Sequence, residues 1–278
     1  MEITSSGSCF KIRLVELEKL KPHEEVIGHI VDELAAGMQL ENKFRDPLMV
    51  DEKALVILDG MHRYAALKKI GCAYALCCLF NYDDPQIKVG SWYRFLNVGD
   101  GDAVAEKKLA ELRLRYKRYS RIDEKHFHHP TIITKVYVYQ TEDSDSMRSA
   151  RLAVQIEKSL IHDGYDIQYA PENTIEENLR SNTSNIVLPI PIFTKTMIRQ
   201  TALTGQLLPH KITRHHIPSR PLRLNVPLTF LQDRVGIEEA NRQLDAHLSL
   251  RQIERKPPGS IVDGRRYQEE LLIFSNGE

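Results

Sequence analysis

The stretch that decides the fold covers residues 54–71 and reads ALVILDGMHRYAALKKIG. Its first five residues are apolar and predict a buried strand, and the amphipathic run at its end predicts a helix. Between them, the letters DGMHR at positions 59–63 predict a sharp turn through glycine into the first turn of that helix. Such a turn aims backbone N–H groups and the positive end of the helix dipole at one point, where His62 and Arg63 can add donors. The stretch therefore predicts a cradle for phosphate groups, with an ordinary strand–turn–helix join as the alternative.

The composition limits the classes of protein to which the chain can belong. Its 278 residues carry 38 basic and 38 acidic side chains, and this balance gives no support to a nucleic-acid-binding role. The four cysteines form no C-x-x-C pair, which argues against a structural zinc site, and Cys77 and Cys78 lie in an apolar run expected to be a buried strand. No signal peptide and no membrane-spanning run is found, so we expect a cytoplasmic protein without a membrane partner.

The first third of the chain has the pattern of a mixed α/β (α+β) unit. Apolar periodicity predicts helices over residues 27–38 and 64–70, and strands over residues 10–17, 47–50, 55–58 and 75–80. Further along, apolar residues three or four apart predict an amphipathic helix from Ala105 to Tyr119. A strand over 131–140, a helix over 149–161 and an edge strand at the end of 265–274 follow. We expect two domains, residues 1–120 and residues 121–278.

A second unusual segment lies between residues 188 and 227. It holds six prolines, and basic and histidine side chains are packed between them, among them Lys211, His215 and Arg220. Because prolines lower the entropy cost of holding a loop in one shape, the segment suits a site that must place several side chains. In an extended run, Lys211, Thr213 and His215 would alternate onto one face, with Arg214 and His216 facing elsewhere. A proline-rich wrap on the surface is the alternative.

The pattern strand–Asp-Gly-x-His-Arg–helix resembles the ParB/sulfiredoxin superfamily, which has three functional branches. Sulfiredoxins carry a catalytic cysteine immediately before the His-Arg pair, and Met61 stands at that position here, so this branch is excluded. ParB-type DNA binders carry a helix-turn-helix region and a basic surface, and the chain shows neither a convincing pattern nor the charge. The remaining branch consists of kinases that act on free serine.

The free serine kinase branch resembles the chain in several separate segments. These are Pro22-His23-Glu24-Glu25, Gly90-Ser91-Trp92-Tyr93 and Lys211-Ile212-Thr213-Arg214-His215, in the order and spacing of that family. Separate matches in order are more specific than one short motif, because chance coincidences multiply. The chain departs from the family at Ile212, where serine is usual, and at Met61, where histidine is frequent.

The resemblance implies a ParB/sulfiredoxin-like core, with a C-terminal portion that closes over the substrate. It implies phosphoryl transfer from ATP or ADP to the hydroxyl of free L-serine, giving O-phospho-L-serine, a product that would suit cysteine biosynthesis. The phosphates would be bound at Gly60, Met61, His62 and Arg63, and Asp59 would hold Mg²⁺ directly or through water. The resemblance, and not the spacing, makes Glu24 the general base in place of Glu25. In an extended segment, Glu25 would point away from Glu24. Residues lining the serine pocket would be Trp92, Lys211, Thr213 and His215.

Several alternatives stay open at this point. A nucleotide-binding regulatory module, or a DNA-associated ParB-like module without kinase activity, could have kept the phosphate cradle. Another small hydroxylated acid could be the acceptor in place of serine. The choice between ADP and ATP, the oligomeric state and the role of residues 125–187 do not follow from the sequence.

Overall fold

The computed structural model describes residues 1–5, 7–123, 129, 131–142, 145–180, 184–232 and 235–276. The chain divides into two units. The first unit consists of Met1–Lys88, Lys195–Leu207 and His215–Glu278, and the second of Val89–Thr194 and Leu208–Arg214. The sequence suggested a single boundary near residue 120, whereas the chain passes between the units four times. Interleaved segments of this kind leave no sign in local composition.

The first unit is built on a five-stranded sheet with the strand order β1-β2-β6-β4-β5. The strands are β1 (Glu2–Ser5), β2 (Ser8–Glu16), β6 (Tyr74–Phe80), β4 (Leu48–Asp51) and β5 (Ile57–Asp59). Strand β4 runs parallel to β6, and the other pairs are antiparallel. All four strands expected in this region are confirmed, and Cys77 and Cys78 are fully buried in β6 as reduced thiols.

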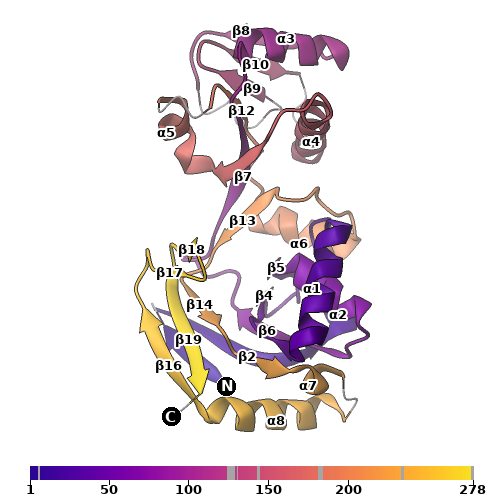
Figure 1. The fold of residues 1–278 in the computed structure, drawn as a ribbon, viewed down its shortest axis with the longest axis vertical. Helices are drawn as coiled ribbons and strands as arrows, with labels where there is room; N and C mark the ends of the chain where they lie inside the picture. Colours follow the sequence, from indigo (N-terminus) through magenta and orange to yellow (C-terminus); the bar gives the residue numbers. More distant parts are fainter. Residues whose placement is uncertain are drawn as a thin grey trace. The chain divides into compact units, whose positions relative to one another are not determined.

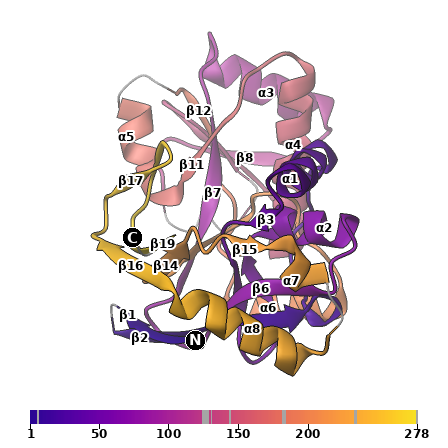
Figure 2. The same ribbon diagram turned by 60° about the horizontal axis from the view of Figure 1, so that its bottom comes forward.

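Helices cover this sheet, as Figures 1 and 2 show. They are α1 (Gly28–Glu41), α2 (Met61–Lys69), α6 (Lys195–Thr204), α7 (Leu228–Gln232) and α8 (Ile237–Ser249). Helix α2 packs on β4 and against α1, whereas α7 packs on β6 and α8 on β2. The two helices predicted over 27–38 and 64–70 are thus confirmed as α1 and α2.

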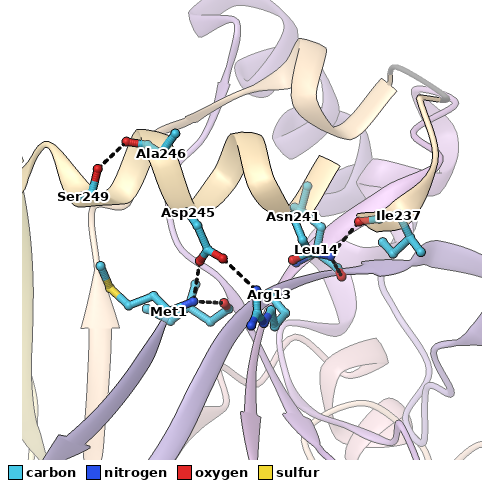
Figure 3. A network of polar contacts seen from close by, with 9 residues as sticks. Met1, Arg13, Leu14, Ile237, Asn241, Asp245, Ala246 and Ser249 are labelled. Carbon is cyan, nitrogen blue, oxygen red and sulfur yellow. Dashed lines mark hydrogen bonds and ion pairs between the residues drawn. The ribbon is translucent and has the colours of Figure 1, made fainter. Parts of the chain in front are cut away.

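Polar side chains of α8 attach this helix to strand β2 of the sheet (Figure 3). The Asn241 amide accepts a hydrogen bond from the Leu14 N–H (2.9 Å) and donates one to the Leu14 carbonyl (3.0 Å). One turn later, Asp245 accepts from Arg13 Nη1 at 2.8 Å and from the Met1 amino group at 2.5 Å. The Asn241 side-chain amide thereby satisfies both the N–H and the carbonyl group of Leu14 in β2.

A smaller sheet of the first unit has the order β14-β19-β16, formed by β14 (Ser219–Leu222), β19 (Glu270–Asn276) and β16 (Arg251–Lys256). The C-terminal strand β19 pairs on both sides, parallel to β14 and antiparallel to β16, so the expected edge strand is a central strand. Short ladders join β3 (Lys43–Phe44) to β15 (Val226–Pro227) and β17 (Ile261–Val262) to β18 (Arg265–Arg266).

The second unit contains a sheet with the strand path β11-β7-β12-β9-β10-β8, in which all of these neighbouring strands pair antiparallel. These strands are β11 (Gln168–Pro171), β7 (Lys88–Leu96), β12 (Ile186–Leu188), β9 (Thr131–Thr134), β10 (Val138–Thr141) and β8 (Tyr116–Tyr119). Its helices are α3 (Gly101–Glu111), α4 (Ser146–His162) and α5 (Ile175–Arg180). Strand β13 (Thr213–His216) begins in this unit and ends in the first.

Two predictions for the second unit are wrong in detail. The helix predicted from Ala105 to Tyr119 ends at Glu111, because Arg113 adopts φ +53° and the chain then enters β8. The strand predicted over 131–140 is a hairpin, in which β9 and β10 pair antiparallel. The helix predicted over 149–161 is confirmed as α4. None of the helices in the described part of the chain combines the length and the apolar character needed to cross a bilayer.

Candidate functional site

The turn at residues 59–63 has the predicted geometry. Strand β5 ends at Asp59, Gly60 adopts φ +104°, and α2 begins at Met61. A Cβ atom on Gly60 would lie 2.7 Å from Leu48 Cδ2, so both the backbone angle and the space demand glycine. The first N–H groups of an α-helix have no acceptor within the helix and carry its positive dipole end. The turn can therefore bind an anion through its backbone.

Two residues of the cradle have side chains that already serve the fold. Met61 is 7% exposed and packs into the core, so only its backbone N–H could serve a ligand. Arg63 Nη1 donates to the carbonyl oxygens of Asp46 (2.6 Å) and Pro47 (2.7 Å), and its Nη2 lies 3.4 Å from Asp59 Oδ2. Arg63 thus ties α2 to the loop before β4 and brings its charge to the turn.

Asp59 is held by a second arginine, to which sequence reasoning assigned no role. Arg220 Nη1 donates to Asp59 Oδ2 at 2.5 Å, and its Nε donates to Glu269 at 2.6 Å. Arg220 is nearly buried, whereas the Asp59 side chain is 40% exposed. Burial alone would raise the pKa of Asp59, but the charges of Arg220 and then Arg63 outweigh it and hold this pKa well below its usual range. Asp59 is therefore ionised at neutral pH.

The surroundings of Asp59 decide how it could take part in binding a metal ion. No group of three metal-ligating side chains occurs among the described residues. Both arginine contacts fall on Oδ2, which leaves Oδ1 as the oxygen able to face a cation. Mg²⁺ in nucleotide sites takes one or two carboxylates and completes its shell with water and phosphate oxygens. Asp59 fits such an ion as a single oxygen ligand, and does not fit a site built from protein groups alone.

The loop before α1 presents Glu24 and Glu25 differently. The Glu24 side chain is 11% exposed, and its Oε1 lies 3.9 Å from His23 Nε2, whereas Glu25 is exposed. His62 holds the end of this loop, because its Nε2 accepts a hydrogen bond from the Ile27 N–H at 3.1 Å. His62, predicted as a phosphate contact, therefore also connects the start of α2 to the Glu24 loop.

His23 lies completely buried beneath Glu24. Its Nδ1 is 2.7 Å from the Ile57 carbonyl oxygen, and since a carbonyl only accepts, Nδ1 carries the proton. Burial lowers the pKa of His23 to about 4, so the ring is neutral at physiological pH. In this tautomer Nε2, the atom 3.9 Å from Glu24 Oε1, is the nitrogen without a proton.

His215 lies in the first unit, in contact with His23 and Tyr82. Its Nε2 is 2.8 Å from the Tyr82 hydroxyl, and its ring meets the His23 ring edge-on at 5.5 Å. Burial, and then the neighbouring His23, lower the pKa of His215 well below the usual value. His215 is therefore a neutral, partly buried histidine.

The other predicted serine contacts belong to the second unit. Lys211 adopts φ +55°, so the predicted extended run begins only at Thr213, and the expected alternation of Lys211, Thr213 and His215 on one strand face is wrong. Thr213 is 8% exposed. Trp92 is partly buried in β7, and the Arg214 guanidinium lies 5.4 Å from the centre of its ring, although Arg214 was expected to face elsewhere.

Comparisons with known proteins show which proteins this chain resembles. An ATP-dependent L-serine kinase from Desulfurococcus mucosus is 25% identical over 232 residues, which are 79% of this chain and 90% of that protein. An ADP-dependent L-serine kinase from Thermococcus kodakarensis is 22% identical over 77% of this chain and 90% of its own length. Over most of its length the chain is thus similar to proteins named L-serine kinases. A ParB-like protein from Sulfolobus acidocaldarius is 34% identical over 89 residues, 32% of this chain and 44% of that protein.

Solved structures confirm the fold expected for a relative of the free serine kinases. A free serine kinase in complex with AMP superimposes with a TM-score of 0.68 at 21% identity, covering 79% of this chain and 93% of that chain. A glutamate-to-alanine variant of a free serine kinase, in complex with ADP, gives the same TM-score at 20% identity. The mixed α/β class with a core like that of the free serine kinases is therefore established. No protein-family model matches the chain.

Proposed function

We propose that the protein is a kinase that transfers the terminal phosphoryl group of ATP or ADP to the hydroxyl group of free L-serine. The observation that carries this proposal is the placement of a shielded carboxylate, Glu24, and an ionised one, Asp59, in the unit that also holds the glycine turn. Relatives named L-serine kinases align with about four fifths of the chain, which supports the same chemistry here. The product would be O-phospho-L-serine.

The nucleotide phosphates would be bound by the first turn of α2. Backbone N–H groups at Met61, His62 and Arg63 would donate to phosphate oxygens, and the absence of a side chain on Gly60 would allow them to come close. Backbone N–H groups of this kind do not distinguish a nucleotide with two phosphate groups from one with three. The named relatives include one ATP-dependent and one ADP-dependent kinase, so both donors are candidates.

Mg²⁺ would enter with the nucleotide, bound at Oδ1 of Asp59 directly or through water. When bound, the ion would neutralise charge on the phosphate groups. Arg220 and Arg63 keep Asp59 ionised and fix Oδ2, so the free oxygen of the carboxylate has one orientation. A fixed carboxylate loses little entropy when it binds.

The serine hydroxyl would lose its proton to Glu24. The serine oxygen then forms a bond to the terminal phosphorus, while the bond from that phosphorus to the bridging oxygen breaks, and ADP or AMP leaves. Neutral His23, 3.9 Å behind Glu24, places no permanent charge on the base. Trp92, Lys211, Thr213 and His215 are proposed to bind serine, with the Lys211 ammonium facing its carboxylate.

Phosphorus NMR tests the proposal. The purified protein is incubated with Mg²⁺, L-serine and either ATP or ADP, and an O-phosphoserine signal is expected in at least one tube. Glu24→Gln should lower turnover by about 10²–10⁴-fold, with nucleotide still bound, because a general base contributes that much. The exposed neighbour offers the matched control, and Glu25→Gln should retain activity.

Two outcomes would contradict this assignment. Nucleotide binding without phosphoserine in either tube would point to another hydroxylated acceptor or to a regulatory role. Equal losses in the two glutamine variants would show that Glu24 is not the base.

A further inference from the structure

Arg94 on β7 is one of the most deeply buried charged side chains in the second unit. It is 1% exposed, and its guanidinium makes four hydrogen bonds within the unit. Its Nε donates to Glu157 Oε2 at 2.8 Å. Its Nη1 donates to the carbonyl oxygens of Trp92 (2.8 Å) and Lys211 (2.9 Å), and its Nη2 donates to that of His210 (3.1 Å). Four of the five donors of a guanidinium are thus engaged by the protein itself.

Glu157 on α4 compensates the charge of Arg94. Its side chain is 6% exposed, and its second oxygen, Oε1, accepts a hydrogen bond from the Tyr169 hydroxyl. A buried ion pair is rarely more stabilising than apolar residues of similar volume. Stability alone therefore gives no reason for this pair, and the positions of the carbonyl acceptors become the informative feature.

Two of the three carbonyl acceptors flank the same Cα atom. The His210 carbonyl belongs to the peptide group before Lys211, and the Lys211 carbonyl belongs to the peptide group after it. The orientations of these two groups define φ and ψ of Lys211. Its φ of +55° lies in the left-handed region, which residues with a Cβ rarely adopt. Arg94 therefore holds Lys211 in a backbone conformation that it would otherwise leave.

Tyr169 acts on the side chain of the same lysine. It is the cross-strand partner of Arg94, and its ring centre lies 4.0 Å from Lys211 Nζ. A cation over the face of an aromatic ring is attracted by the ring's electrons. Since the Tyr169 hydroxyl is bonded to Glu157, the ring cannot turn freely. Arg94, Glu157 and Tyr169, here called the Arg94 cluster, thus hold both the backbone and the ammonium group of Lys211.

We propose that Arg94 is a positioning residue for the amino-acid substrate: through the Arg94 cluster it fixes Lys211, so that the ammonium group is ready for the substrate carboxylate. This inference rests on the proposed function, because that function gives Lys211 its ligand. Arg94 itself does not touch the substrate. The hold on Lys211 is a property of the protein without ligand, and it can be measured separately.

Arg94→Lys is the decisive variant, since an ammonium group keeps the charge but cannot donate along the same fork to Glu157 and three carbonyls. Arg118 offers a matched control in the same unit. It bonds Glu106 at 3.2 Å and lies 4.5 Å from the Tyr137 ring centre, but its side chain is half exposed. Arg118→Lys therefore repeats the substitution in an arginine that holds no predicted substrate residue.

The first readout needs no substrate. Acetylation of Lys211 by acetic anhydride is followed across pH by peptide mass spectrometry, which reports the pKa of this amine. Burial, and then the Arg94 charge, lower the pKa of Lys211 in the wild-type protein. Arg94→Lys should raise it toward that of free lysine, because the released side chain becomes solvated, and Arg118→Lys should leave it unchanged.

The second readout is the kinetics of serine phosphorylation. Arg94→Lys should raise the KM for serine about tenfold, with the KM for nucleotide within about twofold of the wild-type value. A purely structural role would not separate the two KM values in this way. Tyr169→Phe, which keeps the ring and loses only its bond to Glu157, should change both readouts in the same direction by less.

Each outcome decides the inference. Unchanged Lys211 titration in folded Arg94→Lys, or in Tyr169→Phe if the first variant does not fold, would overturn it. A shifted titration with an unchanged serine KM would overturn the role in substrate binding. If the wild-type protein phosphorylates no serine, the proposed function fails, and the titration still shows whether Arg94 holds Lys211.

Discussion

Arg220 in the first unit and Arg94 in the second are both almost completely buried, at 5% and 1% exposure, yet they bind different acceptors. Arg220 bonds two carboxylates, Asp59 and Glu269. Arg94 bonds one carboxylate, Glu157, and three backbone carbonyls. The first arginine therefore controls the charge and orientation of an acidic side chain at the glycine turn. The second controls the path of the backbone around Lys211.

The partners of the two arginines also differ in their access to water. Glu157 is 6% exposed, whereas Asp59 is 40% exposed and keeps Arg63 as a second cation nearby. Removing Arg94 would strand Glu157 in the core. Removing Arg220 would leave Asp59 partly hydrated and Glu269, which is 16% exposed, without its arginine. The comparison teaches that equal burial of two arginines does not imply equal contributions to stability or to function.

Replacing each of these two arginines by methionine tests the comparison, and Arg94→Met is expected to have the largest effect on stability. Arg94→Met should lower the free energy of unfolding by about 3–5 kcal/mol, since Glu157 is left as an uncompensated buried charge. Arg220→Met should cost less, because water and Arg63 still stabilise Asp59. Urea denaturation of the two variants beside the wild-type protein measures the difference.

A double variant provides the control for this experiment. Adding Glu157→Leu to Arg94→Met removes the stranded charge and should restore part of the stability. A larger loss for Arg220→Met than for Arg94→Met would break the comparison.

Acidification should act on the first unit through His23. Its pKa is about 4 in the folded protein and about 6.5 when unfolded, so the unfolded state binds the proton first as the pH falls. The stability that neutral His23 contributes is complete above about pH 6.5 and is lost as the pH falls toward 4, with a share of about 2 kcal/mol between pH 7 and pH 5.

Denaturation of wild type and His23→Asn at these two pH values isolates the share of His23. Asparagine can still donate to the Ile57 carbonyl but does not titrate. The variant should lose less stability on acidification than the wild-type protein. His215, whose pKa is also lowered by burial, adds a loss of the same sign in both proteins. Identical losses in both proteins would show that His23 is not buried in its neutral form.

The smallest effect is expected at the surface of the second unit. Arg118→Met removes an exposed ion pair with Glu106, and such pairs contribute little because water already solvates both charges. Its denaturation midpoint should match that of the wild-type protein within experimental error. A loss as large as that of Arg94→Met would show that burial does not set the difference.

Patterns within one segment predicted the structure well where neighbours in sequence decide it. The strand–glycine–helix stretch at residues 54–71 and the buried β6 have the expected form. The apolar spacing gave a wrong prediction where a single backbone angle interrupts the pattern. It predicted a helix as far as Tyr119, but the helix ends before Arg113, whose φ is positive. The spacing failed again for β19, because whether a strand lies at an edge or in the centre depends on strands elsewhere in the chain.

By itself, the sequence determined the glycine turn at Asp59, the mixed α/β class and the resemblance to free serine kinases, since these rest on short motifs and on their order along the chain. Only the tertiary structure decided that Arg220 holds Asp59 across 161 positions and that Arg94 holds the Lys211 carbonyl across 117. It also decided that Glu24 is shielded while Glu25 is exposed. Burial and charge pairing arise from segments that meet only after folding, so no local pattern contains them.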